Sequence, residues 1–342
     1  MFLKRFRIFH PILYQGAHRK KNYFEGWYFK QTSAGPAAGR TSLGPRSLVF
    51  IPGISRSDDG DHAFVQTLDG ATGASRYFAF PVGAFSASDE PFEVRVGSNR
   101  FSLSGIQADL EDKDGRIQAE IRYGATTPPR SSILSPGVMG PYSFAPFMEC
   151  RHGIASLDHA TAGAATITDA AGTSERISFE GGRGYIEKDW GSSMPRSWIW
   201  LQANNFDHRP EPASFTLSLA RVPWRGAAFN GFICILWIAG TEYRFTTYTG
   251  AHVDLLEYQG STLRILLGDR FHKMEVQVRI ARAGSLAAPS DGAMNRSINE
   301  SADAFLRILL KRRHGATDEL VFDSSSPAAG AELVGDLESL KA

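Results

Sequence analysis

The sequence predicts an all-β protein built from antiparallel strands. Short runs rich in Phe, Tyr, Val, Ile and Thr recur along the chain, and clusters of Gly, Pro, Asp and Ser separate them, which is typical of a β-sandwich or β-barrel. Many runs alternate between apolar and polar residues, as in 274–280, so that one face of the strand is expected to be buried. In chain order, strands are expected at 23–32, 47–54, 62–69, 76–82, 92–97, 100–106, 116–123, 152–159, 164–168, 175–180, 183–190, 197–204, 213–222, 229–239, 242–249, 252–258, 262–267, 271–281 and 318–323.

Three segments without a strand pattern interrupt this series. The Gly- and Pro-rich stretch 33–46 is typical of a surface loop. The stretch 124–147 combines five prolines with Tyr and Phe, and a loop this apolar is expected to pack as a lid over a cavity. A third loop is expected at 283–295. The segment 301–313 fits either an amphipathic helix or a strand, and we favour the strand.

Length and composition limit the class of protein. The 342 residues are enough for two domains, and 42% hydrophobic with 21% charged residues is typical of a globular chain. A net charge of +1 gives no field for a polyanion, so we expect no nucleic-acid partner. Cys150 and Cys234 form neither a metal cage nor a CxxC pair, which fits the cytoplasm. The longest apolar run, 227–240, falls short of the roughly 20 residues that span a bilayer.

The N-terminus mixes basic and large apolar residues. Charges interrupt what would be the apolar core of a signal peptide, so secretion is not expected. One interpretation of residues 1–9 is a contact with the inner face of the membrane, with Lys4, Arg5 and Arg7 on anionic headgroups. The other, which we slightly favour because nine residues with three charges make a poor amphipathic helix, is a tail or edge strand that packs on the first domain. The sequence does not determine the oligomeric state.

A weak internal similarity divides the chain. The aromatic run Gly26–Lys30 opens one series of strands and Trp198–Gln202 opens a second, although chance resemblance between aromatic strands is an alternative. The similarity places a boundary near Pro195. We therefore expect an N-terminal domain at 1–194 and a C-terminal domain at 195–342.

Common catalytic signatures are absent. The sequence has no GxGxxG, GxxxxGK[ST], GxSxG or HExxH motif, which removes the usual support for nucleotide, serine-hydrolase and zincin functions. Glu149 and His152 form a lone ExxH outside any clear helix. We therefore expect no metal site.

Carboxylates stand among aromatic residues in one predicted strand. Alternation places Tyr185, Glu187 and Asp189 on one face. If that face is buried, desolvation and mutual repulsion raise the pKa of one carboxyl, which leaves a proton donor beside an anion. The alternative is a solvated face on which the carboxylates pair with Arg183 or Lys188.

A second strand has the composition of a pocket wall. Gln202 and Asn204 follow Trp198 and Trp200, so that one face is aromatic and then amide. Trp27, like these two tryptophans, is by default a core residue.

Three motifs carry a family resemblance. The segments YFEGWYFK (23–30), FMECRHG (147–153) and GYIEKDWG continuing to WIWLQAN (184–204) resemble the tocopherol cyclase family. The resemblance implies a pair of lipocalin-like β-barrel domains. It also implies a cofactor-free reaction in which a prenylated quinol or related prenyl lipid is protonated at its proximal alkene, and the phenol oxygen closes on the tertiary cation.

The resemblance suggests roles for particular residues. Asp189 with Glu187 would supply the proton, and Glu149, His152 or Glu25 would accept the phenolic proton. Aromatic faces would stabilise the cation. The expected substrate-binding residues are Glu25, Trp27, Tyr28, Lys30, Tyr185, Trp190, Trp198, Trp200, Gln202 and Asn204.

Two other functions stay open. Lipocalin-like domains commonly bind a ligand without converting it, so a non-catalytic carrier of hydrophobic ligands is the main alternative. A membrane adaptor that acts through its basic N-terminus is the other. The orientation of Glu187 and Asp189, toward a cavity or toward solvent, distinguishes the enzyme from the carrier.

Overall fold

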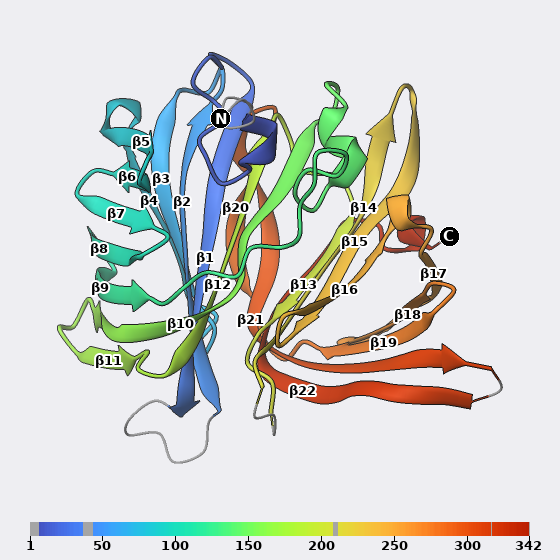
Figure 1. The fold of residues 1–342 in the computed structure, drawn as a ribbon. Coiled ribbons are helices and arrows are strands. Elements are labelled where there is room, and N and C mark those ends of the chain that lie inside the picture. The colour runs from blue at the N-terminus through green and yellow to red at the C-terminus, as the bar shows by residue number, and fades with distance from the viewer. Residues whose placement is uncertain (1–6, 37–43, 208–210, 316, 342) are drawn as a thin grey trace. The chain divides into compact units, whose positions relative to one another are not determined.

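The protein is almost entirely β-structure. The computed structural model describes residues 7–36, 44–207, 211–315 and 317–341. Strands make up 66% of the structure and helices 5%, which confirms the all-β prediction (Figure 1). The described helices are all short 3-10 turns, among them η2 (Arg7–Phe9) and η4 (Gly140–Phe144). None of them is long and apolar enough to cross a membrane.

The chain forms two compact units. Unit 1 comprises Met1–Asp69, Ala74–Met194 and Ser285–Ser297. Unit 2 comprises Gly70–Gly73, Pro195–Gly284 and Ile298–Ala342.

Unit 1 is built on an antiparallel sheet. Its strands are β1 (Tyr23–Pro36), β2 (Pro45–Arg56), β3 (His62–Asp69), β4 (Ser75–Pro81), β5 (Phe85–Asp89), β6 (Phe92–Val96), β7 (Asn99–Ser102), β8 (Gly105–Asp112), β9 (Gly115–Tyr123), β10 (Cys150–Asp169), β11 (Ser174–Ser178) and β12 (Gly182–Gly191). The order within the described residues is β4-β3-β2-β1-β12-β10-β9-β8-β7-β6-β5, with β11 paired to β10. Strands β2 and β3 also contact β6, so the sheet curls around one core. Alternation puts Trp27, Phe29 and Ile186 into that core.

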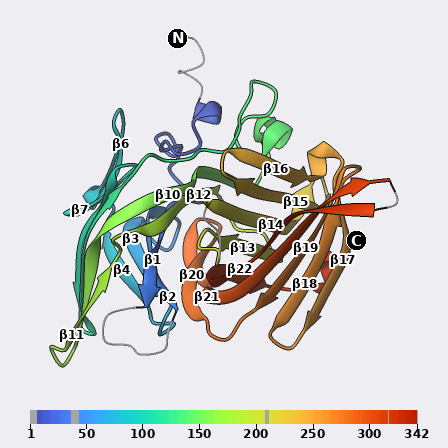
Figure 2. The same ribbon diagram turned by 60° about the horizontal axis from the view of Figure 1, so that its bottom comes forward.

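Unit 2 is built on a second antiparallel sheet. The strands of this sheet are β13 (Trp198–Ala203), β14 (Ala213–Trp224), β15 (Ala227–Ile238), β16 (Thr241–Thr246), β17 (His252–Gln259), β18 (Thr262–Gly268), β19 (His272–Arg279), β20 (Gly284–Ser290), β21 (Ala293–His314) and β22 (Thr317–Val334). Residues Ser285–Ser297, which include most of β20 and the start of β21, belong to unit 1. The order is β16-β15-β14-β13-β22-β21-β19-β18-β17 in the part of the chain that is described, with β20 paired to β21. Strands β21 and β22 pair along most of their length (Figure 2). Ile199, Leu201 and Ala203 of β13 enter the unit 2 core.

The two sheets share one strand order. In each sheet, the first four strands lie side by side in reverse chain order, from the fourth at the edge to the first. The other neighbour of the first strand is the last strand of the sheet, and beyond it the remaining strands follow in reverse chain order to the opposite edge. Strands β1 and β13 therefore occupy equivalent places. These are the strands whose aromatic runs suggested an internal repeat.

Several elements differ from the sequence expectation. Segment 301–313 is a strand, as predicted, within β21. The loop expected at 283–295 is wrong, because β20 and the start of β21 form a hairpin there. Its Ala- and Ser-rich sequence lacks the usual β-formers. The Gln66 side chain holds it in place, because its Nε2 donates to the Ala287 carbonyl and its Oε1 accepts from the Ala287 N–H. Strand β10 is continuous where two strands were expected.

The register of β10 and β12 positions the residues of interest. His152 pairs with Asp189, and Arg151 pairs with Trp190. Paired residues share a face, so the first pair lies on the face opposite the core and the second on the core side. Strand β12 ends at Gly191, where φ is +153° and a Cβ would collide with the carbonyl of Glu149.

Candidate active site

Three ionisable side chains meet on the face of β10 and β12 that is turned away from the unit 1 core. Nδ1 of His152 lies 2.9 Å from Oδ1 of Asp189, and its Nε2 lies 3.6 Å from Oε2 of Glu187. Glu187 precedes Asp189 by two residues, so both carboxylates project from the same face. The imidazole therefore lies between two carboxylates.

This arrangement makes His152 a cation at neutral pH. Burial lowers the pKa of the imidazole, but the charges of Asp189 and Glu187 and the hydrogen bond to Asp189 outweigh burial. Together they raise the pKa of His152 from 6.5 to about 9. The cluster thus holds a proton that the imidazole and the two carboxylates share.

The two carboxylates differ in environment. The hydroxyl of Tyr185 donates a hydrogen bond of 2.6 Å to Oε2 of Glu187. The Glu187 side chain is 5% exposed, whereas that of Asp189 is 23% exposed. Asp189 is therefore the carboxylate that a substrate reaches more easily, and Glu187 is the more firmly held.

The bases expected beside these carboxylates have other partners. The guanidinium of Arg183 forms an ion pair with Asp158, and the ammonium of Lys188 forms one with Glu25 on the opposite face. The structure places His152 against the carboxylates instead. The predicted proximity of Glu187 and Asp189 is present, with an imidazole inserted between them.

The same three side chains have the composition of a metal site. His152, Glu187 and Asp189 each offer a ligand atom, and these atoms lie within 4.8 Å of one another. A metal needs a lone pair of the imidazole, but both ring nitrogens point toward carboxylates, as hydrogen-bond donors do. The geometry fits a hydrogen-bonded cluster better than a coordination sphere. The absence of a metal stays a prediction.

The side chains of Glu25 and Lys188 form a buried ion pair. Both side chains are fully buried, and Glu25 also accepts hydrogen bonds from the Tyr23 hydroxyl and from the main-chain N–H groups of Gln15 and Gly16. Burial lowers the pKa of Lys188 from 10.5 to about 8, against the opposing effect of Glu25. This pair fastens the N-terminal segment to β1 and β12.

Two tryptophans flank the ammonium of Lys188. Its Nζ lies 4.9 Å from the ring centroid of Trp27 and 4.6 Å from that of Trp190. Trp27 has no exposed surface, and its Nε1–H donates to the carbonyl of Ile12 at 2.7 Å. In this structure Glu25 and Trp27 are both interior residues.

The other predicted binding residues of unit 1 lie on the face of the His152 cluster. Tyr28 pairs with Glu187, and Lys30 pairs with Tyr185. Both are buried. The strand register thus brings Tyr28, Lys30 and Tyr185 together with the two carboxylates.

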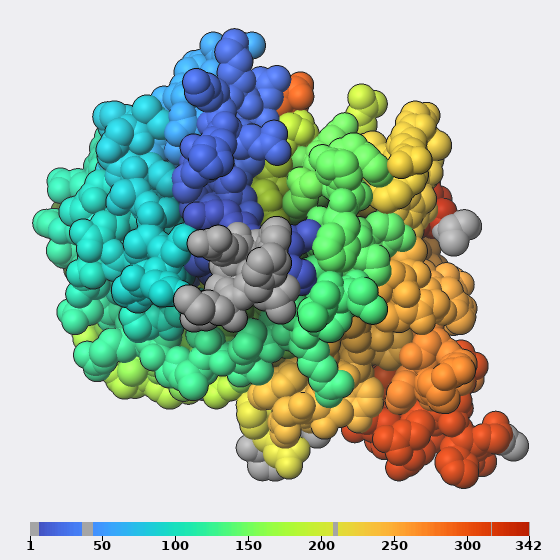
Figure 3. Space-filling model, turned by 45° about the horizontal axis from the view of Figure 1, so that its top comes forward, coloured from blue at the N-terminus to red at the C-terminus, as the bar shows by residue number. Residues whose placement is uncertain are grey.

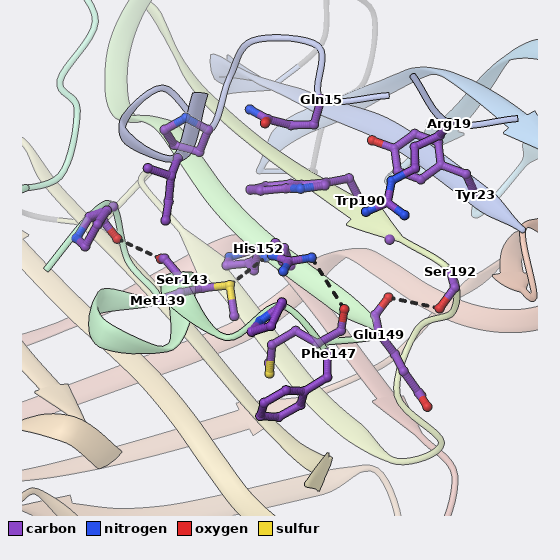
Figure 4. Close-up of a pocket in the computed structure, with 18 of the residues that line it drawn as sticks. Gln15, Arg19, Tyr23, Met139, Ser143, Phe147, Glu149, His152, Trp190 and Ser192 are labelled. Carbon is purple, nitrogen blue, oxygen red and sulfur yellow. Dashed lines mark hydrogen bonds between the residues drawn. The ribbon is translucent and has the colours of Figure 1, made fainter. Parts of the chain in front are cut away.

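A cavity of about 470 Å³ lies in unit 1 where β10 begins and β12 ends (Figure 4). It is lined by the N-terminal segment between Ile8 and Tyr23, by the loop between Pro136 and Glu149, and by Arg151, His152 and Trp190. Figure 3 shows the N-terminal segment in blue and this loop in green on one face. The predicted lid loop therefore does border a cavity.

Only some of the predicted site residues line this cavity. His152 borders it, and its main-chain N–H points to Sδ of Met139 at 3.2 Å. Trp190 and Glu149 also line it, but the Glu149 side chain extends away from His152 (Figure 4). Glu187 and Asp189 are not among the lining residues.

The predicted residues of unit 2 lie on and just after β13. Trp198, Trp200 and Gln202 alternate with the core residues of that strand, so they lie on its other face, and all are buried. Nε1 of Trp198 donates to the carboxylate of Glu332 on β22. Asn204 follows the end of the strand and is also buried.

The sequence did not single out Arg19, Tyr23, Met139 and Arg151 as lining residues. Arg151 stands within the FMECRHG motif, directly before His152, which is the signal that would have found it. Arg19, Tyr23 and Met139 come together at the cavity only in the folded chain, and no sequence motif marks them.

Comparison with known proteins assigns a family. The family model described as tocopherol cyclase-like matches residues 110–335. The chain is 26% identical over 168 residues to the chloroplastic tocopherol cyclase of Zea mays, and 24% identical over 168 residues to the probable tocopherol cyclase of Oryza sativa subsp. japonica. Each match covers 47% of this chain and 35% of the relative, so the chain matches about a third of the length of these proteins.

A solved structure shares the fold. The crystal structure of CghA with Sch210972 is similar with a TM-score of 0.57 and 12% sequence identity, over 92% of this chain and 89% of that one. At this identity the likeness concerns the fold alone. Because the family model matches most of the chain, the protein belongs to the tocopherol cyclase-like family.

Proposed function

We propose that this protein is a cofactor-free cyclase of the isomerase type that acts on a prenylated quinol or a related prenyl lipid. The observation that carries the proposal is the position of His152 between Asp189 and Glu187, a proton-holding cluster on a largely buried face. Family membership supports the reaction class. The matched relatives are tocopherol cyclases by name, which supports the choice of substrate.

The reaction needs only one proton in and one proton out. A proton adds to the proximal alkene of the prenyl chain, the phenol oxygen bonds to the resulting tertiary cation, and the phenolic proton returns to the protein. A C–H and a C–O bond form while the C=C π bond and the O–H bond break, so the product is an isomer of the substrate. Neither an oxidant nor a reductant is required.

We assign the proton to the Asp189–His152 pair. The proton held by His152 passes through its hydrogen bond to Asp189, and the carboxyl group delivers it to the alkene as a general acid. The greater exposure of Asp189 favours this residue as the one that meets the alkene. Glu187, held by Tyr185, keeps His152 protonated. Tyr28, Lys30, Trp198, Trp200, Gln202 and Asn204 stay proposed substrate-binding residues.

Turnover in D₂O tests the proposal directly. Purified protein is incubated with prenylated hydroquinones of several chain lengths, and the products are analysed by chromatography with mass spectrometry. We expect an isomer that carries one carbon-bound deuterium, which the Asp189→Asn variant does not produce. Unchanged substrate at every chain length, or a product without carbon-bound deuterium, contradicts the proposed mechanism.

The carrier function has its own supporting observation. The cavity of unit 1 has the volume of a small-molecule site, yet neither Glu187 nor Asp189 lines it. A hydrophobic ligand that copurifies with the protein and is released unchanged would favour the carrier.

A further inference from the structure

Two arginines face the unit 1 cavity from different elements. Arg19 belongs to the N-terminal segment, and Arg151 belongs to β10 on the face opposite the His152 cluster. The positive charge of Arg19 acts on Arg151, whose pKa burial and this charge both lower. The two guanidinium groups are therefore close enough to repel each other.

Neither arginine has a carboxylate partner among the described residues. Arg151 donates to the main-chain carbonyls of Ala145 at 2.8 Å and Met148 at 3.5 Å, which fixes the side chain without neutralising it. Arg19 lies over the ring of Tyr23, 6.0 Å from its centroid (Figure 4). Glu25, on the same face as Tyr23, is already paired with Lys188.

The rest of the cavity wall is mixed, with polar side chains such as Gln15, Asn22 and Glu149 beside apolar ones. Pro11, Val138, Met139, Phe147 and Trp190 contribute to it. Gly153 supports this packing, since a Cβ there would press on Pro11 and on the ring of Trp190. The cavity thus combines two arginines that form no salt bridge among the described residues with an apolar patch, and Glu149 is the carboxylate among its lining residues.

We propose that this cavity binds a hydrophobic small molecule that carries one anionic head, a carboxylate or a phosphate, held by Arg19 and Arg151. Guanidinium groups bind both kinds of oxyanion through charge-assisted hydrogen bonds, and the binding of an anion relieves the repulsion between the two arginines. Arg151 reaches the cavity from the face of β10 opposite Asp189, and Asp189 is not among the lining residues. The inference therefore does not depend on the proposed cyclisation.

Three probes with the same alkyl chain test the site: decanoate, decyl phosphate and decanol. Their affinities for the full-length protein are measured by calorimetry at low and high salt. We expect both anions to bind about tenfold or more tightly than decanol and to weaken with salt. The anion that binds more tightly identifies the head group.

Variants assign the effect to the arginines. Arg19→Gln and Arg151→Gln should each weaken the binding of the anions about tenfold and leave that of decanol unchanged. Because Arg151 also holds the loop at Ala145, Arg151→Lys serves as the charge-preserving control and should retain part of the anion preference. If decanol binds as tightly as the anions, or if the double Gln variant keeps the preference, the proposal is wrong.

A last variant separates this site from the proposed catalysis. Asp189→Asn should bind the anions as wild type does. A protein that prefers the anions but never cyclises a quinol refutes the proposed function alone. Cyclisation without any anion preference refutes the present inference alone.

Discussion

Nδ1 of His152 donates a hydrogen bond to Oδ1 of Asp189 at 2.9 Å, across a strand pair that joins residues 37 positions apart. The same imidazole meets Glu187 through its other nitrogen at 3.6 Å. A side chain that bridges two carboxylates keeps its proton well above neutral pH. Two of the predictions below follow from this bridge.

Asp189→Asn should reduce turnover of a prenylated quinol by at least about a hundredfold, the usual contribution of a general acid. The amide keeps the volume and the contact with His152 but cannot donate an acidic proton. Glu187→Gln should reduce the rate less, because Glu187 acts through His152. Steady-state kinetics measure both variants, and thermal unfolding controls for the fold. Full activity in both contradicts the assignment.

The stability of the protein should fall as the pH rises from about 6.5 to about 9. The pKa of His152 is about 9 in the folded protein and near 6.5 when unfolded, so the folded state binds the extra proton between these values. The proton on His152 contributes on the order of 3 kcal/mol to the free energy of unfolding, and this contribution is fully present below pH 6.5. Denaturant titrations at several pH values should show this loss in wild type and a smaller one in His152→Gln. If the free energy of unfolding falls equally with pH in both proteins, the pKa of His152 is not raised.

His159 should make the protein sensitive to acid. Burial lowers the pKa of its imidazole to about 3, and its ring packs on Tyr123 with centroids 4.4 Å apart. As the pH falls from 6.5 to 3, His159 is protonated in the unfolded chain but not in the folded protein. The free energy of unfolding therefore decreases by up to about 1.4 kcal/mol per pH unit. His159→Phe, which keeps an aromatic ring, should flatten this dependence in urea titrations. An unchanged slope would show that other groups dominate.

The Glu25–Lys188 pair should be structural. Lys188→Met leaves a buried carboxylate without its cation and should cost about 3 to 5 kcal/mol of unfolding free energy. The double variant Glu25→Gln/Lys188→Met should recover much of that loss. Urea unfolding of the three proteins measures this. If the single variant costs less than about 1 kcal/mol while quinol binding is lost, Glu25 has the binding role that the sequence suggested.

The membrane contact proposed for residues 1–9 remains open to test. Residues 1–6, with Lys4 and Arg5, lie outside the described part of the chain. Arg7 forms a salt bridge of 3.1 Å with Asp89, which favours packing on unit 1 for this residue. Co-sedimentation with anionic liposomes should show salt-sensitive binding that deletion of 1–9 abolishes. Undiminished binding by the truncated protein excludes this segment as the anchor.

The local sequence patterns predicted the all-β fold class and the residues on one face of the candidate site. Alternation placed Tyr185 and Glu187 side by side, and their hydrogen bond confirms it. It did not predict which face of a strand meets the core, because β1 is buried on both faces. Glu25 and Trp27, which we predicted to bind substrate, are both buried, and their binding role stays a prediction.

The contact of His152 with Asp189 could not be predicted. It depends on the pairing of β10 with β12 in one register, and β10 carries irregularities near Ile154 and Ser156 that no local signal marks. The convergence of Arg19 and Arg151 likewise depends on how the N-terminal segment folds back over β10. Such contacts arise from tertiary packing.

The shared strand order has a consequence for how the chain folds during synthesis. In each unit the first strand pairs with the last, β1 with β12 and β13 with β22, so the middle of each sheet is completed only when the final strand emerges from the ribosome. Such long-range pairing folds slowly. Unit 1 also contains Ser285–Ser297, so its last piece is made after most of unit 2. Until then, the nascent chain exposes unpaired edges at its most aromatic strands, which are the natural targets of a chaperone.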